Sequence, residues 1–205
     1  AYAYRDAVYV RVLGPVGVLQ GGVEVALGGP KQRTVLALLA TRAREVVPVD
    51  ALIDGVWGEE PTPGARSTLQ TYVSNLRAAI GDVIVREGGG YRLELDPRAV
   101  DAVQFAEAVE QARELVEASP PEAAQRLRAA LALWRGHPYA DVSASSPLEL
   151  EAQRLEELRL AAVESRIDAE LAMGQATELV AELEVLCSEY PLREELRAQH
   201  MLALY

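Results

Sequence analysis

The side chains in this chain that are best suited to chemistry are small hydroxyl and amide groups spaced to fall on one face of a helix. They are Ser67, Gln70, Thr71, Ser74 and Asn75. Such groups donate and accept hydrogen bonds in patterns that match the edges of base pairs in the major groove of DNA. They lie beside no paired acid, base or nucleophile that would make them catalytic. The chemistry that they favour is recognition by hydrogen bonding.

A single helix over residues 62–80 is predicted to position these groups. Thr62 is a good N-cap and Pro63 a good first helical residue. At about 100° per residue, an apolar stripe falls on the side opposite the polar groups. That stripe consists of Leu69, Val73, Leu76 and Ile80. We therefore expect the apolar side to be buried and the polar side to face outward.

Two arginines edge the polar face of this helix. Arg66 and Arg77 lie at the boundary between its two sides, where they can reach phosphate or guanine. The alternative is an ordinary solvated surface helix. Such a helix more often carries Glu and Lys, and residues 62–80 contain neither.

A two-stranded ribbon is predicted to follow the helix over residues 83–95. Arg86 and Arg92 lie on either side of a run of glycines at 88–90, with Tyr91 between them. A basic hairpin beside a helix in the major groove can touch the backbone or the minor groove. Any tight hairpin uses glycines, so the hairpin alone favours no ligand. It is not a phosphate-binding loop, because no Gly-Lys-Ser/Thr follows it.

The elements before this helix are predicted to form its support. Residues 8–27 are β-branched and broken by glycines, which is typical of short antiparallel strands. Helices are expected over 30–44 and 49–57, with Lys31 and Arg33 exposed on the first and available to phosphates. The order is therefore sheet, three helices and hairpin.

Beyond residue 97 the strand signals end and short breaks separate helical segments. Helices are expected over 101–118, 121–135, 148–173, 176–190 and 192–205. Each carries an apolar stripe, and stacked helical hairpins of this kind are typical of tetratricopeptide-like repeats. We therefore predict an α+β winged helix-turn-helix domain over 1–97 and an all-α helical-repeat domain over 98–205.

The two parts of the chain differ in charge. The net charge of −11 argues against nucleic-acid binding if the chain is taken whole. Residues 1–100, however, carry 11 basic and 11 acidic side chains, whereas residues 101–205 carry 9 and 20. The first part can present a local basic face to phosphate. The second would be repelled by DNA and is better suited to contacts with protein.

Other classes of protein find little support in the sequence. The longest apolar runs are far too short to span a bilayer, and the start has no apolar signal-peptide region. A single cysteine, Cys187, fits a reducing cytoplasm. His137 and His200 have no other ligands at metal-binding spacing, so we expect no metal, no cofactor and no enzymatic activity. The ends of the chain suggest a fragment of a longer protein.

Residues 8–96 resemble an OmpR-type winged-helix domain, most clearly at Leu69–Arg77 and at Gly89–Leu93. With Leu131–Val142 included, the chain resembles the Streptomyces antibiotic regulatory protein family, in which a bacterial transcriptional activation domain follows the winged helix. The resemblance spans about Val8 to Tyr205. It implies a transcription activator that binds promoter direct repeats, often as side-by-side protomers, and recruits RNA polymerase. Many members control secondary-metabolite genes.

Residues and resemblance together lead to one preferred function. The helix over 62–80 would lie in the major groove, with its hydroxyl and amide groups on the bases. The predicted phosphate contacts are Lys31, Arg33, Arg66 and Arg77, and the predicted wing contacts are Arg86, Tyr91 and Arg92. The acidic part would face RNA polymerase, its sigma factor or a neighbouring protomer. The family often has basic residues where this chain has Asn75 and Ala78, which alters the expected base preference.

Two alternatives remain open from the residues alone. One is a protein-interaction module in which the repeats bind a partner and the winged helix is a docking surface. The other is a small-molecule-sensing regulator with a pocket near Trp134 and Tyr139.

Overall fold

The computed structural model describes residues 8–58, 60–143 and 145–205. The start of the chain, where we noted no signal-peptide region, lies outside the described residues. The described chain divides into two compact units. The first takes in the chain up to Gln104 together with Trp134–Glu156, and the second consists of Phe105–Leu133 and Glu157–Tyr205.

An antiparallel sheet opens the first unit. It pairs β1 (Val8–Arg11) with β2 (Gly17–Gln20) and β2 with β3 (Val23–Val25). Val8 and Val10 of β1 are buried, whereas Tyr9 and Arg11, which alternate with them, are partly exposed. This alternation is that of a half-buried strand. The short antiparallel strands predicted for residues 8–27 are therefore confirmed.

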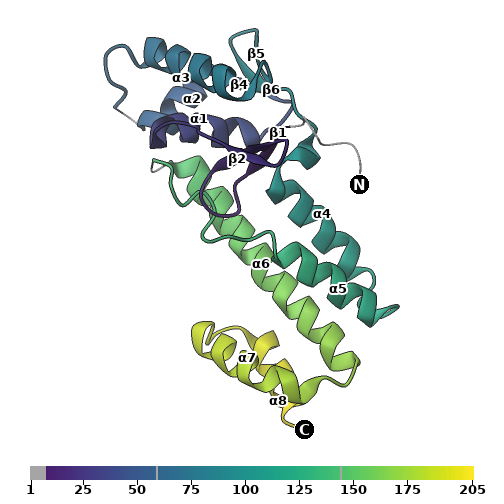
Figure 1. Cartoon of the computed structure of the whole chain (residues 1–205). Helices are drawn as coiled ribbons and strands as arrows, with labels where there is room; N and C mark the ends of the chain where they lie inside the picture. The colour runs from purple at the N-terminus through teal and green to yellow at the C-terminus, as the bar shows by residue number, and fades with distance from the viewer. Residues whose placement is uncertain (1–7, 59, 144) are drawn as a thin grey trace. The chain divides into compact units, whose positions relative to one another are not determined.

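Helices α1 (Pro30–Ala40), α2 (Val49–Trp57) and α3 (Ala65–Ile80) follow and pack on one another (Figure 1). Their packed sides supply a large part of the core of the first unit. Fully buried members of that core are Leu36, Leu39, Leu52, Leu69, Leu76 and Ile80. Residues spaced three and four apart in sequence supply this core, as an amphipathic helix requires.

A second antiparallel sheet has the order β4-β6-β5 and contains the predicted hairpin. Its strands are β4 (Val46–Pro48), β5 (Ile84–Glu87) and β6 (Gly90–Leu93). The hairpin is formed by β5 and β6, as expected from the sequence. Strand β4 was not predicted, because a run of that length is too short to show an alternating pattern.

Two helix ends in the winged helix differ from the prediction, each at a local backbone feature. The helices predicted over 101–118 and 121–135 also end early, at Arg113 and Leu131. Helix α1 ends at Ala40 rather than Arg44, since Arg44 adopts a φ of 69° and donates its N–H to the carbonyl of Leu93. A residue in the left-handed region cannot continue an α-helix. Helix α3 begins at Ala65 rather than near Thr62, because Gly64 has a φ of 87°.

The elements in the rest of the described chain are helical. It contains the 3₁₀ turn η1 (Pro97–Ala99) and helices α4 (Asp101–Arg113), α5 (Pro120–Leu131), α6 (Ser146–Ala172), α7 (Ala176–Glu189) and α8 (Glu194–Ala203). A winged helix followed by an all-α part is the predicted fold class, and it is confirmed.

The second unit has its own apolar contacts. Leu160, Ile167, Leu179, Leu183 and Leu196 form one buried cluster, against which Cys187 packs while partly buried. Helices α7 and α8 pack on each other as a helical hairpin (Figure 1).

Candidate nucleic-acid interface

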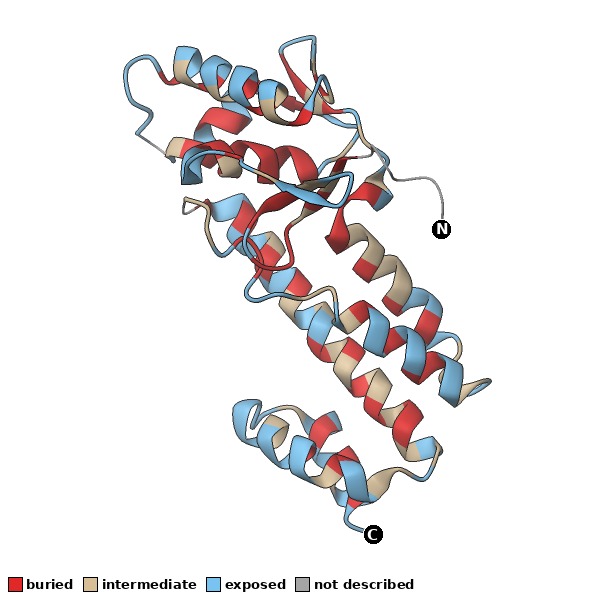
Figure 2. Ribbon diagram, in the orientation of Figure 1, coloured by how far each residue is buried: buried red, intermediate tan, exposed pale blue. Residues whose placement is uncertain are grey.

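The polar side of α3 is exposed along its length, and Figure 2 shows it in pale blue. The exposed residues are Arg66, Ser67, Gln70, Thr71, Ser74, Asn75 and Ala78. The opposite side is held in the core, where Leu69, Val73, Leu76 and Ile80 are at most 1% exposed. The structure therefore brings all the hydroxyl and amide groups singled out in the sequence onto one outer surface.

Two of the hydroxyls on this surface also stabilise the helix locally. Ser67 donates through Oγ to the carbonyl of Gly64 at 2.8 Å, and Thr71 donates through Oγ1 to the carbonyl of Ser67 at 3.1 Å. Both oxygens keep lone pairs that can accept further hydrogen bonds. Toward an outside partner, Ser67 and Thr71 are therefore acceptors in this conformation.

Arg66 and Arg77, at the edges of α3, have different surroundings. Arg66 pairs with Asp50 on α2 at 2.7 Å, and both side chains are more than half exposed. Exposed pairs of this kind contribute little and are easily exchanged. Arg77 donates through Nε to the carbonyl of Ile84 at 2.6 Å, which fixes its guanidinium beside β5.

Asn75 is tied to α1. Its Nδ2 donates to Oε1 of Gln32 at 3.3 Å, and Gln32 is itself only 8% exposed. The carboxamide of Gln32 lies against Gly28, where an added Cβ would come within about 3.1 Å of the amide. The orientation of Asn75 is thus coupled to a buried side chain on another helix.

Lys31 and Arg33 lie on the first turn of α1, and their surroundings differ. The Lys31 ammonium sits 5.3 Å from the centre of the Trp57 ring, which stacks on Tyr72 of α3 at 6.1 Å. A cation over an aromatic face keeps its charge and its remaining donors. Arg33 instead pairs with Asp141, whose other carboxylate oxygen accepts from the backbone N–H of Val16 at 2.6 Å. The guanidinium of Arg33 is therefore engaged inside the first unit.

The wing residues also differ in whether their side chains are accessible or engaged within the first unit. Arg86 is exposed on β5, and no ion pair forms at it among the residues that the structure describes. Arg92 on β6 pairs with both Glu87 and Glu94 at 2.6 Å. Tyr91 is 4% exposed, so its ring packs in the core rather than pointing outward.

Gly90 explains part of the glycine run in the wing. A Cβ at this position would lie 2.2 Å from the carbonyl oxygen of Val47, a distance that no side chain tolerates. The close approach that this glycine permits is made by β6 to the neighbouring strand β4. Gly88 forms the tip with a φ of 54°, and the carbonyl of Gly89 accepts from Val49.

A segment that the sequence gave no reason to place here packs on the winged helix. Residues 135–143 run along the end of β1, where the N–H groups of Arg135 and Tyr139 donate to the carbonyls of Leu13 and Val12. Further along, the N–H of Ser143 donates to Oγ1 of Thr34 on α1 at 3.1 Å. No short-range pattern could have indicated these contacts, because they join residues more than 100 positions apart.

Asp101 anchors this arrangement. It is 1% exposed and accepts from the backbone N–H groups of Val12 at 2.7 Å and Leu13 at 3.2 Å, with Arg135 at 3.5 Å. Burial raises the pKa of its carboxyl, against the opposing effects of those hydrogen bonds and of Arg135. Burial, with a smaller contribution from Asp101, also raises the pKa of Tyr9 to about 12.

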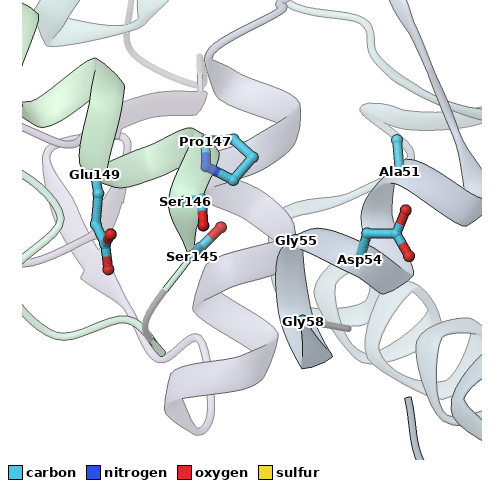
Figure 3. A pocket seen from close by; sticks show the side chains of 8 residues that line it. All are labelled: Ala51, Asp54, Gly55, Gly58, Ser145, Ser146, Pro147 and Glu149. Carbon is cyan, nitrogen blue, oxygen red and sulfur yellow. The ribbon is translucent and has the colours of Figure 1, made fainter. Parts of the chain in front are cut away.

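Two hollows in the first unit lie near the start of α6. The larger, of about 730 Å³, lies between the Ser145–Glu149 stretch and α2, where Ala51, Asp54, Gly55 and Gly58 line it (Figure 3). The smaller, of about 170 Å³, is lined in part by His137, Tyr139 and Leu148. Ser145 lines both, and its buried Oγ has no hydrogen-bond partner among the described residues. The expected pocket near Tyr139 therefore has a counterpart, although Trp134 does not line it.

Within residues 8–58, 60–143 and 145–205, no three His, Cys, Asp or Glu side chains are grouped so that they could hold a metal ion. None of the helices in that part of the chain combines the length and apolarity needed to cross a membrane.

Two protein families match the chain, one after the other. Residues 22–93 match the family described as transcriptional regulatory protein, C terminal, and residues 100–205 match the bacterial transcriptional activator domain. The first match contains α3 and the wing, and the second begins one residue before α4.

Relatives match the chain across both parts. The regulatory protein DnrI of Streptomyces peucetius is 37% identical over 96% of this chain and 77% of its own length. The regulatory protein AfsR of Streptomyces griseus is 37% identical over 99% of this chain, which spans only 21% of that protein. The structure of Mycobacterium tuberculosis EmbR in complex with a low-affinity phosphopeptide has a TM-score of 0.90 and 35% identity, covering 96% of this chain and 54% of that chain.

Proposed function

The chain belongs to the Streptomyces antibiotic regulatory protein family of transcription regulators, and from that premise we propose that it binds promoter DNA in a sequence-specific manner and activates transcription. Because several relatives are much longer than this chain, the activity of a complete protein is part of the proposal. We assign it no enzymatic reaction and place it in the cytoplasm with its DNA.

The exposed polar face of α3 carries this proposal. A single α-helix such as α3 has a width that fits the major groove. Gln70, Ser74 and Asn75 would contact base edges there, and Ser67 and Thr71 would add acceptors near the same bases. The face contains no carboxylate to repel phosphates.

The proposed phosphate contacts are the cations whose surroundings leave them accessible. They are Lys31, Arg66, Arg77 and Arg86. Arg33 and Arg92 are held by carboxylates, and Tyr91 is buried, so we assign these three to the support of the interface. The sequence had grouped all seven together as direct contacts.

The salt dependence of binding tests this assignment. If four phosphates are contacted, log K plotted against log salt concentration should fall with a slope of about −3.6 per protomer. The measurement is fluorescence anisotropy with a labelled duplex taken from the region flanking the gene of this protein. Replacement of Lys31, Arg66 and Arg86 by Ala should bring the slope close to −1. A slope near zero for the unchanged protein would contradict DNA binding by this surface.

Activation would come from the acidic part of the chain. Residues 101–205 carry 20 acidic and 9 basic side chains, a balance suited to protein rather than DNA. We propose that RNA polymerase or its sigma factor is the partner. In transcription with purified polymerase, residues 1–205 should raise transcript yield from a cognate promoter. An equal yield with and without the protein, at full promoter occupancy, would remove this part of the proposal.

Direct repeats would let side-by-side protomers bind more tightly than one. A contact between neighbours raises the effective concentration of the second protomer. Probes with one and two copies of the site should therefore differ, with the second protomer binding more tightly than the first. Equal affinities for both steps would indicate independent protomers.

Small-molecule sensing is a second candidate, favoured by the unpartnered Oγ of Ser145 at the hollow beside α2. A fragment library of alcohols and amines, screened by thermal shift, would test it. A hit should lose its effect in Ser145→Ala. The protein-interaction alternative predicts instead a tight protein complex and no shift of any DNA.

A further inference from the structure

A buried neighbour restricts the hydrogen bonds that the Asn75 side chain of α3 can make to an outside partner. A free carboxamide has two N–H donors on its nitrogen and one carbonyl acceptor. One N–H of Asn75 is already given to Oε1 of Gln32 at 3.3 Å. What remains for an outside partner is one N–H and the carbonyl oxygen.

That remainder matches one base and not another. Adenine offers the N7 acceptor and the N6 amino donor side by side in the major groove, so it needs one donor and one acceptor. Guanine offers the N7 and O6 acceptors, so it needs two donors. With one N–H engaged, Asn75 can satisfy both positions of adenine but only one position of guanine.

The position of Gln32 is itself built into the fold. It lies on the first turn of α1, 8% exposed, and its amide packs against Gly28. Gly28 has a φ of 79°, a conformation that favours glycine, and a Cβ there would crowd the amide at about 3.1 Å. Gln32 is therefore buried against the backbone at Gly28, in a place that depends on glycine, while its Oε1 accepts from Asn75.

We propose that Gln32 is a positioning residue that commits Asn75 to reading adenine. This rests on the proposed function, since it assumes that α3 lies in the major groove. It identifies adenine as the base at one position of the DNA site. It also gives a role in specificity to Gln32, a buried residue on a helix that does not itself enter the groove.

Selection of duplexes from a random pool tests the proposal, with the 205-residue chain and its variants. The unchanged protein should enrich one position that is adenine, preferred over guanine by about 5- to 150-fold. Asn75→Asp, on an exposed site, should change that same position toward cytosine, because a carboxylate accepts from the cytosine N4 amino group.

The Gln32 variants separate positioning from a structural role. Gln32→Met removes the acceptor at similar volume, so the adenine preference at that one position should fall toward one while the other positions stay unchanged. Gln32→Glu keeps an acceptor for Asn75 and should retain the preference, even if overall affinity drops. Thermal melting of each variant reports whether it is folded at the assay temperature.

Each failure has its own meaning. If the unchanged protein enriches no motif, the proposed function fails. If a motif is enriched but its Asn75-dependent position is guanine, or if Gln32→Met leaves the adenine preference intact, DNA binding stands and the role of Gln32 is overturned. Loss of adenine preference in a folded Gln32→Glu would overturn it as well.

Discussion

Arg86 and Arg92 occupy paired strands of the same hairpin, yet their surroundings give them different tasks. Arg86 is exposed, whereas Arg92 is held between Glu87 and Glu94. We expect Arg86→Ala to make the salt slope of DNA binding shallower by about 0.9, the contribution of one phosphate contact. Anisotropy titrations at several salt concentrations would measure it.

Arg92→Ala is the matched control for Arg86→Ala. It removes the same charge from the neighbouring strand, but that charge is already balanced by two carboxylates. The slope should therefore stay within the error of the unchanged protein. A larger effect for Arg92→Ala than for Arg86→Ala would show that the wing contacts DNA through its other strand.

Asp101 makes a pH-dependent contribution to stability whose sign follows from its burial. Burial raises the pKa of its carboxyl above the ordinary value of 3.8. At pH values between 3.8 and the folded pKa, the folded chain therefore holds a proton that the unfolded chain has lost. Its contribution is therefore fully present below pH 3.8 and is lost as the pH rises through the folded pKa. The free energy of unfolding, relative to that of Asp101→Asn, should fall across this window.

Denaturant titrations of both proteins at a series of pH values would measure the difference. Asp82→Asn, at an exposed position, gives the background of replacing a carboxylate in this chain. A difference that rises with pH would mean that the hydrogen bonds from Val12 and Leu13 outweigh burial.

At the scale of single residues, the sequence predicted which side chains of α3 face outward but not which cations are free. The helical period fixes the outward side, and the buried stripe confirms it. The partner of Arg33 is Asp141, 108 positions away, and the partner of Asn75 is Gln32, 43 positions away. Spacing along one helix contains no information about partners that tertiary packing brings together.

Among the secondary-structure elements, the wing depends on a glycine that allows two strands to approach. Gly90→Ala would place a Cβ 2.2 Å from the carbonyl oxygen of Val47, so β4 and β6 would have to separate. We expect a loss of about 3 kcal/mol or more in the free energy of unfolding, the upper range for overpacking. Chemical denaturation would measure it.

Gly89→Ala is the control within the same turn. A Cβ at Gly89 meets nothing within 4 Å, and its φ lies outside the left-handed region. The loss should be about 1 kcal/mol or less, as for a surface substitution. Equal losses at Gly89 and Gly90 would mean that the turn, rather than the contact with β4, requires glycine.

The elements themselves were largely predictable, because helices of this length show their period clearly. Strand β4, the start of α3 and the ends of α1, α4 and α5 were not. Val46–Pro48 is too short for a pattern, and the left-handed conformations of Arg44 and Gly64 depend on the strand pairing and turns around them. For Gly64 the sequence offered a competing N-cap at Thr62, which the structure leaves outside the helix.

For the whole molecule, the division into two compact units does not follow the change in sequence character after Pro97. Trp134–Glu156 belongs to the same compact unit as the winged helix. Hydrogen bonds to Leu13, Val12 and Thr34 hold part of that stretch in place. The predicted boundary between residues 97 and 98 follows where strand signals end, and helical periodicity carries no information about which core a later segment joins.

The link between Asp141 and Arg33 suggests that the winged helix needs this later stretch to be stable. Asp141→Ala leaves the guanidinium of Arg33 and the N–H of Val16 without their acceptor. Removing a partner from such part-buried groups costs about 1–3 kcal/mol for each. Denaturant unfolding of residues 1–205 should therefore show a loss of at least about 1 kcal/mol, and an unchanged midpoint would show that the stretch is only loosely held.

The most direct test of the account is the ratio of affinities for a selected site and for a scrambled duplex, at one salt concentration. We expect a ratio of about 10³ or more for the unchanged protein. Replacing Gln70, Ser74 and Asn75 together by Ala should bring the ratio toward one, with affinity for the scrambled duplex unchanged. A ratio that survives this replacement would contradict the claim that the outer face of α3 reads the DNA sequence.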